Sequence, residues 1–265
     1  MLPVCLGRAT RLADYLSGGE KSYYGEMRIG YETDTQDIWG KVVKRYASAI
    51  LHTPDDGAWI RDIFRRLEGD IEQEIPAYSA VKHKGKSMYQ YARAGHDVTG
   101  MTRPVFIRHM ELLWFSEDRI GFRVCCGGGT YVRMLCRDIG RLLGTGGTMS
   151  FLLRLDVGPF SLDTSSTLEE IHQRAEKGEA SLQEIIQPKE LALQAMPYIE
   201  VSEQEAKHLR YGQAIWQPFT EEGSSIPGDG VWAKDKQEQL VAIGKMDWVS
   251  TGASRGLRFK PDKTF

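Results

Sequence analysis

The chain has 265 residues, of which 41% are hydrophobic, and a formal net charge of −2. This composition suits a globular protein with a sizeable core, and the charge gives no global sign of a nucleic-acid partner. No apolar run is long enough to span a bilayer. The apolar stretch at the start, MLPVCLGRATRL, is too short for a signal peptide and is followed by arginines. The four cysteines form no C-x-x-C pair and the six histidines show no metal-ligand spacing, so we expect free thiols, no metal and a cytoplasmic setting.

The first hundred residues alternate between helical and extended patterns. In chain order, the patterns predict a helix over 9–16, a half-buried strand over 21–31, a polar loop over 33–40, a short strand over 41–46, an amphipathic helix over 58–67, an extended segment over 71–81 that Pro76 breaks, and a helix over 87–94. The stretch from Lys82 to His96 contains no carboxylate. Its basic residues are Lys82, Lys84, Lys86 and Arg93, interleaved with tyrosines. It is compatible with a focused polyanion contact and equally with a solvated surface loop.

Two strands that form a hairpin are predicted next, over 105–115 and 120–125, followed by the glycines of CCGGGTYVRM and a helix over 131–143. A strand over 149–157, a helix over 167–177 with a Thr-x-x-Glu capping box, a linker and a set of short strands complete the chain. The order is not a βαβ repeat. The sequence therefore predicts an α+β (mixed α/β) fold with hairpins and a small C-terminal β domain.

The glycine turn after the second hairpin strand carries the clearest chemical signal. It lacks both the G-x-G-x-x-G and the P-loop patterns, so phosphate binding is not predicted. The glycines instead favour a close approach to the backbone, with Tyr131 and Arg133 facing what approaches. Together with Tyr23 and Tyr24 on the strand over 21–31, these side chains suit a stacked planar group such as an extruded base. Each signal alone is weak, since such residues are more often ordinary core or surface positions.

Five motifs in order carry a family resemblance: LPVCLGRAT, KSYYGEMRIGYETDTQDIWG, IPAYSAVKHKGKSMYQYARAG, GGGTYVRMLCRDIGRLLG and LLRLDVGPF. The chain closely resembles bacterial tRNA pseudouridine synthases of the TruB type, which isomerise uridine 55 in the TΨC arm of tRNA. The resemblance implies a pseudouridine-synthase catalytic domain with a mixed, largely antiparallel sheet over 1–187. It also implies a thumb-like RNA-binding insertion over about 73–100, a linker over 188–197 and a PUA-like β-barrel over 198–265.

The same resemblance implies roles for individual residues. Tyr23 corresponds to the active-site tyrosine that stacks on the flipped base and is proposed to take part in proton removal from C5. Tyr131 corresponds to a substrate-contacting tyrosine, Arg133 to the arginine that pairs with the catalytic aspartate, and Leu152 to a leucine of the uridine pocket. Lys82, Lys84, Lys86 and Arg93 become candidates for RNA phosphate contacts. We expect tRNA as partner, a monomer, and no cofactor, membrane or metal.

One family element does not occur in the printed sequence. The catalytic aspartate of the family lies in a G-x-L-D-P-L-A-T-G loop directly before the stretch that matches Met1. Asp14, Asp34 and Asp37 sit in other family segments and are not expected to replace it. We therefore expect the chain as printed to be inactive, either because the natural protein begins upstream or because this is a fragment. The alternatives are a non-catalytic T-arm RNA-binding fragment and a plain α/β protein with a solvated basic surface.

Overall fold

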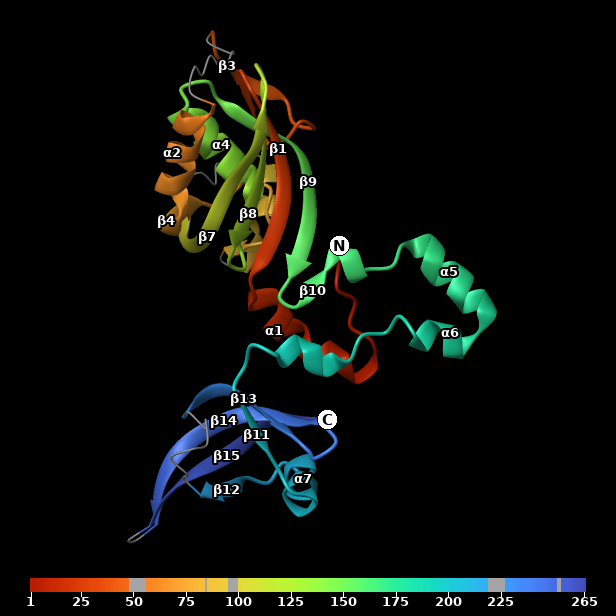
Figure 1. Cartoon of the computed structure of the whole chain (residues 1–265). Coiled ribbons are helices and arrows are strands. Elements are labelled where there is room, and N and C mark those ends of the chain that lie inside the picture. Colours follow the sequence, from red (N-terminus) through yellow and green to blue (C-terminus); the bar gives the residue numbers. More distant parts are fainter. Residues whose placement is uncertain (48–55, 84, 95–99, 219–226, 252–253) are drawn as a thin grey trace. The chain divides into compact units, whose positions relative to one another are not determined.

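The computed structural model describes residues 1–47, 56–83, 85–94, 100–218, 227–251 and 254–265. The chain divides into two compact units, one of residues 1–2 and 17–165 and the other of residues 3–16 and 166–265 (Figure 1). Within the described residues, no helix is both long enough and apolar enough to cross a membrane.

A six-stranded antiparallel sheet is the centre of the first unit, with strand order β10-β9-β1-β8-β7-β4. Its strands are β1 (Lys21–Ile29), β4 (Gly69–Glu74), β7 (Thr102–Phe115), β8 (Arg119–Cys126), β9 (Gly147–Val157) and β10 (Phe160–Ser161). The predicted hairpin is β7 and β8, and it is confirmed. β1 lies between β8 and β9, so its alternating side chains are divided between the two faces of the sheet.

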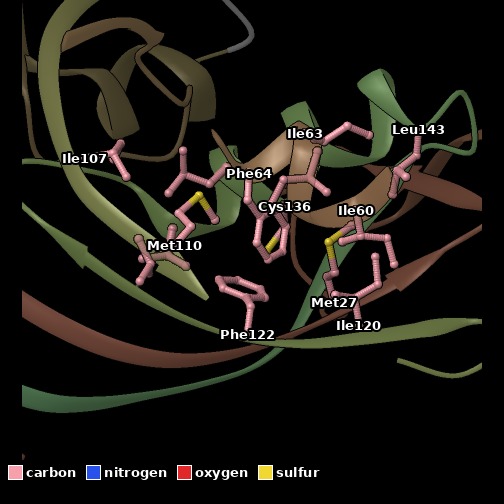
Figure 2. Packing of buried hydrophobic residues seen from close by; sticks show 14 of the residues in the cluster. Met27, Ile60, Ile63, Phe64, Ile107, Met110, Ile120, Phe122, Cys136 and Leu143 are labelled. Carbon is pink, nitrogen blue, oxygen red and sulfur yellow. The ribbon is translucent and has the colours of Figure 1, made fainter. Parts of the chain in front are cut away.

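Two amphipathic helices cover one face of this sheet, α2 (Ala58–Leu67) and α4 (Val132–Leu142), as Figure 1 shows. Their apolar stripes pack on the inward side chains of the strands, which is why both segments have helical spacing. Phe64 of α2 meets Phe122 of β8 edge to face, with ring centroids 6.1 Å apart. Figure 2 shows these rings packed with Met27, Ile60 and Cys136 in a continuous apolar cluster.

α4 and β9 approach each other through glycines. A Cβ atom on Gly140 would lie 2.2 Å from the backbone of Gly146 and Gly147. A Cβ atom on Gly147 would lie 2.3 Å from the carbonyl oxygen of Cys136. Because no side chain fits in this space, the helix backbone rests directly on the strand backbone.

The first 165 residues also contain shorter elements. They are η1 (Gly7–Leu12), α1 (Ala13–Gly18), β2 (Tyr31–Thr33), β3 (Val42–Arg45), β5 (Lys82–His83), β6 (Lys86–Ser87), α3 (Met88–Arg93) and η2 (Leu162–Thr164). The single helix predicted over 9–16 is wrong in type, because a 3₁₀ segment forms first and the α-helix follows it. The strand predicted over 21–31 is interrupted at Gly30, whose φ of 98° turns the chain into β2. β2 pairs with β3 as an antiparallel hairpin.

The second unit contains a five-stranded sheet with the order β11-β13-β14-β15-β12. Its elements are α5 (Leu168–Lys177), α6 (Glu179–Gln183), η3 (Lys189–Leu193), β11 (Tyr198–Glu200), α7 (Glu203–Arg210), β12 (Ile215–Pro218), β13 (Gly228–Lys234), β14 (Leu240–Thr251) and β15 (Ser254–Thr264). The predicted capping box at Thr167 and Glu170 is confirmed. Leu209 of α7 packs with Val241 and Phe259 in the core of this sheet.

The compact units divide the chain differently from the predicted domains at 187 and 198. The segment expected to be a linker is packed. Leu193 is fully buried, and the Met196 carbonyl accepts a hydrogen bond from the Trp232 indole at 3.3 Å. Leu12, near the start of the chain, joins the same apolar cluster. Both segments belong to the second unit because they bury apolar side chains against its sheet.

Candidate active site

A pocket of about 320 Å³ opens on the first unit. Its lining residues are Tyr23, Thr130, Tyr131, Val132, Arg133, Met149 and Leu152. The volume lies at the lower end of the range for small-molecule sites, which suits a single planar base. The three side chains predicted for substrate contact, Tyr23, Tyr131 and Leu152, therefore lie around one pocket with Arg133, which is predicted to pair with the catalytic aspartate. Their chemical roles stay predictions.

Three elements that are distant in sequence supply these walls. Tyr23 comes from β1, Leu152 from the neighbouring β9, and Tyr131 and Arg133 from the start of α4. The pairing of β1 with β9 shifts register between Ser22 and Tyr23. Such irregularities re-aim a side chain, and this one lies at the pocket wall. Tyr24 points to the opposite face, where its hydroxyl donates to Glu26 at 2.7 Å.

Other segments of the chain lie very close to the glycine turn before α4. A Cβ atom on Gly128 would lie 2.8 Å from the carbonyl oxygen of Ser17, and one on Gly129 would lie 2.9 Å from the Arg103 guanidinium. Gly129 also has a φ of 91°, a conformation that favours glycine. The close approach that the glycines predict is therefore present, but its partners are the protein's own backbone and an arginine.

Arg133 is the main charged group of the pocket. Its guanidinium lies 4.0 Å from the Asp37 carboxylate and donates to the Tyr78 carbonyl. Burial lowers the pKa of Arg133, and the charge of Asp37 opposes that shift. The Nε atom of Arg133 is buried and has no hydrogen-bond partner among the described residues. The guanidinium therefore retains a donor for a further acceptor.

Asp37 is a pocket neighbour that the sequence patterns do not predict. The sequence only rules it out as a replacement for the catalytic aspartate, whereas the structure places its carboxylate beside Arg133. Side-chain hydroxyls fix its loop: Thr33 donates to the Asp37 carbonyl and Thr35 to its carboxylate, both at 2.7 Å. The backbone of Asp37 also forms a parallel bridge with pocket-lining Met149. The run of polar side chains in TDTQD is the sequence signal for a fixed turn here, because such side chains form hydrogen bonds with the nearby backbone.

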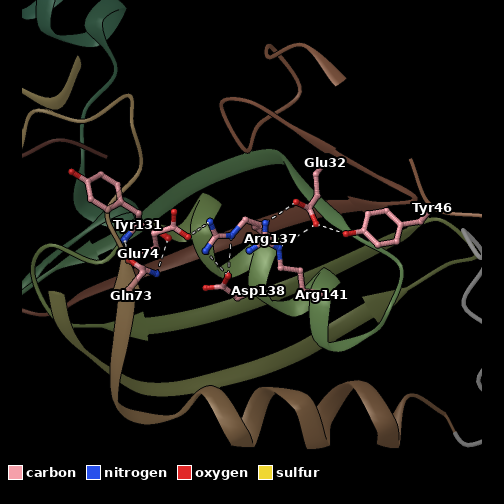
Figure 3. Close-up of polar contacts among 8 residues, drawn as sticks. All are labelled: Glu32, Tyr46, Gln73, Glu74, Tyr131, Arg137, Asp138 and Arg141. Atoms are coloured by element: carbon pink, nitrogen blue, oxygen red, sulfur yellow. Dashed lines mark hydrogen bonds and ion pairs between the residues drawn. The ribbon is translucent and has the colours of Figure 1, made fainter. Parts of the chain in front are cut away.

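Tyr131 is held by its backbone as well as by its ring. Gln73, only 1% exposed, accepts from the Tyr131 N–H at 2.8 Å and donates to the Tyr131 carbonyl at 3.2 Å (Figure 3). The guanidinium carbons of Arg103 and Arg133 lie 4.8 Å and 5.6 Å from the ring centroid. The first turn of α4 is thus fixed to β4, and the ring is contacted by two cations.

Tyr23 lies near the first residue of the printed chain. Burial raises the pKa of Tyr23, with the Cys126 thiol adding to the shift and Arg154 opposing it. In the sheet register Tyr23 stands opposite Arg154. The Arg154 side chain donates to the Met1 carbonyl at 2.9 Å, and the Met1 amino group donates to the Arg154 carbonyl at 3.1 Å. Met1 is therefore fixed next to the pocket wall.

A polar network along α4 holds the helix to its neighbours (Figure 3). Arg137 pairs with Glu74 of β4 at 2.7 Å and with Asp138 at 2.8 Å. One turn later, Arg141 pairs with Glu32 of β2 at 3.0 Å. Burial raises the pKa of Asp138. For Glu32, burial acts in the same direction, but hydrogen bonds from Arg141 and Tyr46 outweigh it and lower the pKa.

The basic stretch starts at the pocket, but its charged side chains lie outside the description. Tyr78 contacts Tyr89 edge to face, with centroids 6.3 Å apart, and its carbonyl accepts from Arg133. Lys84 is not among the described residues, and neither are the side chains of Lys82, Lys86 and Arg93. Their predicted RNA contacts stay predictions. Across the part of the chain that is described, no three His, Cys, Asp or Glu residues converge as metal ligands.

Two family models match consecutive parts of the chain. Residues 1–132 match the TruB family pseudouridylate synthase N-terminal domain, and residues 133–194 match the tRNA pseudouridylate synthase B C-terminal domain. The boundary between the two matches falls inside the first turn of α4, between Val132 and Arg133.

Curated relatives resemble the chain over most of its length. It is 42% identical over 224 residues to tRNA pseudouridine synthase B of Geobacillus thermodenitrificans, covering 82% of this chain and 72% of the relative. It is 37% identical over 219 residues to the protein of the same name from Alkaliphilus oremlandii, covering 83% and 70%.

Solved structures share the fold. A Cbf5-Nop10-Gar1 complex contains a chain that matches with a TM-score of 0.72 at 24% identity, covering 98% of this chain and 70% of that one. An H/ACA RNP bound to a substrate RNA containing 2′-deoxyuridine gives a TM-score of 0.70 at 23% identity, with the same coverage. At this identity the likeness concerns the fold alone, and it agrees with the predicted mixed, largely antiparallel architecture.

Proposed function

The chain belongs to the TruB family of pseudouridylate synthases, and from this premise we propose that it isomerises a uridine in the T arm of tRNA. In this reaction the glycosidic bond from the ribose to N1 breaks and a bond from the ribose to C5 forms. The C5 proton leaves and N1 gains one, so no oxidant or reductant is consumed. Residues that hold the base and a carboxylate, with a group that accepts the C5 proton, are sufficient for this chemistry.

The observation that carries the proposal is the convergence of Tyr23, Tyr131, Arg133 and Leu152 on one pocket. A flipped uridine loses its stacking in the RNA, and the Tyr23 ring would replace part of it, worth about 1–3 kcal/mol per base. Leu152 offers an apolar wall. The Tyr23 hydroxyl is neutral at pH 7, because the pKa of a tyrosine is ordinarily near 10 and burial raises it further, so this group can donate or accept a hydrogen bond near the base.

A carboxylate fits the charge of this pocket. The Arg133 guanidinium is partly buried and keeps an unpaired Nε donor. A guanidinium in this setting keeps a neighbouring carboxylate ionised and orients it. The family resemblance implies a catalytic aspartate on a loop directly before Met1. Since Met1 is bonded to Arg154 opposite Tyr23, a loop joined there would begin at the pocket.

Tritium release from T-arm RNA that contains 5-tritiated uridine tests the proposal. The polypeptide with a G-x-L-D-P-L-A-T-G segment joined to Met1 is expected to release tritium. In the joined protein, Arg133→Lys should reduce the rate about 100-fold, because lysine lacks the paired N–H donors with which a guanidinium binds a carboxylate.

The matched control is Arg141→Lys on the same helix, whose partner is Glu32 and which does not line the pocket. It should retain most of the activity. Equal losses in the two variants would contradict the role given to Arg133. Binding of T-arm RNA without release in every form would favour a non-catalytic RNA-binding protein. The cytoplasmic setting, the monomeric state and the PUA-like character of the C-terminal sheet remain predictions.

A further inference from the structure

The loop between β2 and β3 presents large apolar side chains to solvent. Trp39 is 89% exposed, and Ile38, Val42 and Val43 are 42%, 44% and 63% exposed. Single exposed apolar residues are ordinary on protein surfaces, but here four of them occur within six consecutive residues of one short hairpin. We call residues 38–45 the Trp39 surface.

Hydrogen bonds fix the turn that carries the indole. The Trp39 N–H donates to the Asp37 carboxylate at 3.0 Å, and the Lys41 N–H donates to the Asp34 carboxylate at 2.8 Å. Gly40 fits tightly, because a Cβ atom there would lie 2.3 Å from the Thr35 hydroxyl. The exposed ring is therefore attached to a pre-ordered backbone, which reduces the entropy lost when a partner binds.

The Trp39 surface begins at the pocket. The Ile38 N–H donates to the carbonyl of pocket-lining Met149 at 3.0 Å, and Asp37 lies 4.0 Å from Arg133. One residue separates Asp37 from Trp39, so their Cα atoms are within about 8 Å of each other. A ligand that fills the pocket and extends past Asp37 therefore comes close to the turn that carries Trp39.

The charge of the surface favours a polyanion. Lys41, Lys44 and Arg45 occur between residues 38 and 46 with no carboxylate among them. In the described part of the chain none of the three forms an ion pair, although Lys44 lies 4.5 Å from the centre of the Tyr46 ring. The nearest acids are already bonded: Asp34 and Asp37 accept from the backbone N–H groups of Lys41 and Trp39. Glu32 is buried and bonded to Arg141 and Tyr46.

We propose that the Trp39 surface binds the substrate RNA next to the target uridine. The indole stacks on an unpaired base, and Lys41 and Arg45 contact phosphates. Interleaved aromatic and cationic side chains are the arrangement that holds single-stranded nucleic acid. The inference rests on the proposed function for the choice of RNA and adds a binding surface to it. A protein partner or a second copy of the chain is not favoured, because the surface is cationic as well as apolar.

Anisotropy titration of a fluorescein-labelled, unmodified T-arm stem-loop RNA tests the stacking. Trp39→Ala should weaken binding about 5- to 10-fold, the lower part of the range for one stacked base, and Trp39→Phe should weaken it less. Trp59→Ala is the matched control, because Trp59 is also exposed, at 41%, but lies on α2. It should leave affinity unchanged. Equal affinity of Trp39→Ala and the parent would overturn the proposal.

A salt series tests the phosphate contacts. In the Lys41→Ala/Arg45→Ala double variant the slope of log affinity against log salt should fall by about 1.4, from about 0.7 per contact on a single strand. Arg61→Ala, an exposed arginine on α2 without an ion pair among the described residues, should not change it. An unchanged slope in the double variant would remove the phosphate contacts from the proposal.

Two further measurements separate this proposal from the proposed function. Crosslinking of 5-bromouridine RNA to the parent chain should give a peptide that contains Trp39, and a crosslink confined to other peptides would overturn the proposal.

If an unrelated stem-loop RNA binds as tightly as the T arm and Trp39→Ala still weakens its binding, the T-arm substrate is wrong but the Trp39 surface remains an RNA-binding surface. If Trp39→Ala changes only the sedimentation of the protein without RNA, the occupant is a second copy and the proposal is wrong.

Discussion

Gln73 joins the sheet to the pocket by bonding to both backbone groups of Tyr131. A glutamine amide supplies one donor and one acceptor in a fixed geometry, so a single side chain satisfies an N–H and a C=O at once. The side chain is buried, and water cannot replace it without opening the structure. The position of the Tyr131 ring therefore depends on a residue that does not line the pocket.

Gln73→Ala should lower the free energy of unfolding by about 1–3 kcal/mol, since it leaves the Tyr131 N–H without its acceptor, whereas the Tyr131 carbonyl still accepts from the N–H groups of Met134 and Leu135. RNA affinity should fall as well, because the first turn of α4 loses its attachment. Urea unfolding and RNA titration give both numbers, with exposed Gln173→Ala as the control. Loss of stability with unchanged RNA affinity would show that the clamp does not position the ring.

Helix α4 is held at its far end by the pair of Arg141 with Glu32, and this pair makes stability depend on pH. The pKa of Glu32 is lowered in the folded protein from the ordinary value of 4.5. As pH falls, the unfolded chain binds this proton first. The contribution of ionised Glu32 is therefore complete above about pH 4.5 and is lost as pH falls through the lowered pKa. Asp138, whose pKa is raised, has the opposite sign.

Glu32→Gln should accordingly cost about 1–3 kcal/mol of unfolding free energy at pH 7 and much less at acid pH, where the parent has lost the same contribution. Urea unfolding between pH 3 and pH 7 measures the difference. Glu72→Gln, an exposed glutamate on β4, serves as the control and should follow the parent at every pH. A constant difference between Glu32→Gln and the parent across this range would contradict the assignment.

Local patterns predicted the elements well, and contacts between distant residues account for what they missed. The spacing of 58–67 and the capping box at Thr167 predicted helices, because both signals lie within one segment. The two-point bond of Gln73 and the place of Asp37 beside Arg133 depend on which strands become neighbours. The contact of Gly140 with β9 has the same origin, since a glycine in a helix gives no sign in sequence of what lies against it. The glycine turn and the strand over 21–31 pointed to Tyr131, Arg133 and Tyr23, whereas Leu152 and the role of each residue came from the family resemblance.

At the scale of the molecule, an early segment completes the core of the C-terminal unit. Leu12, 1% exposed, packs with Leu193, Trp232, Leu240 and Ile243. Leu12→Ala should therefore destabilise the second unit by about 2–5 kcal/mol, the cost of removing a buried leucine side chain.

Hydrogen exchange of peptides from β13 and β14 should report that loss, while peptides from α4 and β8 should keep their protection. Leu6→Ala, at a leucine 58% exposed, is the control and should stay within about 0.5 kcal/mol of the parent. If the two variants are equally stable, residues 3–16 contribute nothing to this core.

The central position of β1 also has a consequence for synthesis of the chain on the ribosome. Lys21 pairs with Cys126 on one side and with Val157 on the other, so β8 and β9 are translated about a hundred residues or more after β1. At a translation rate of about 5–20 residues per second, β8 is synthesised roughly 5–20 s after β1, and β9 follows later still. Throughout that interval both edges of the strand are open to other nascent chains. The wall that carries Tyr23 is therefore among the last parts of the first unit to be completed during translation.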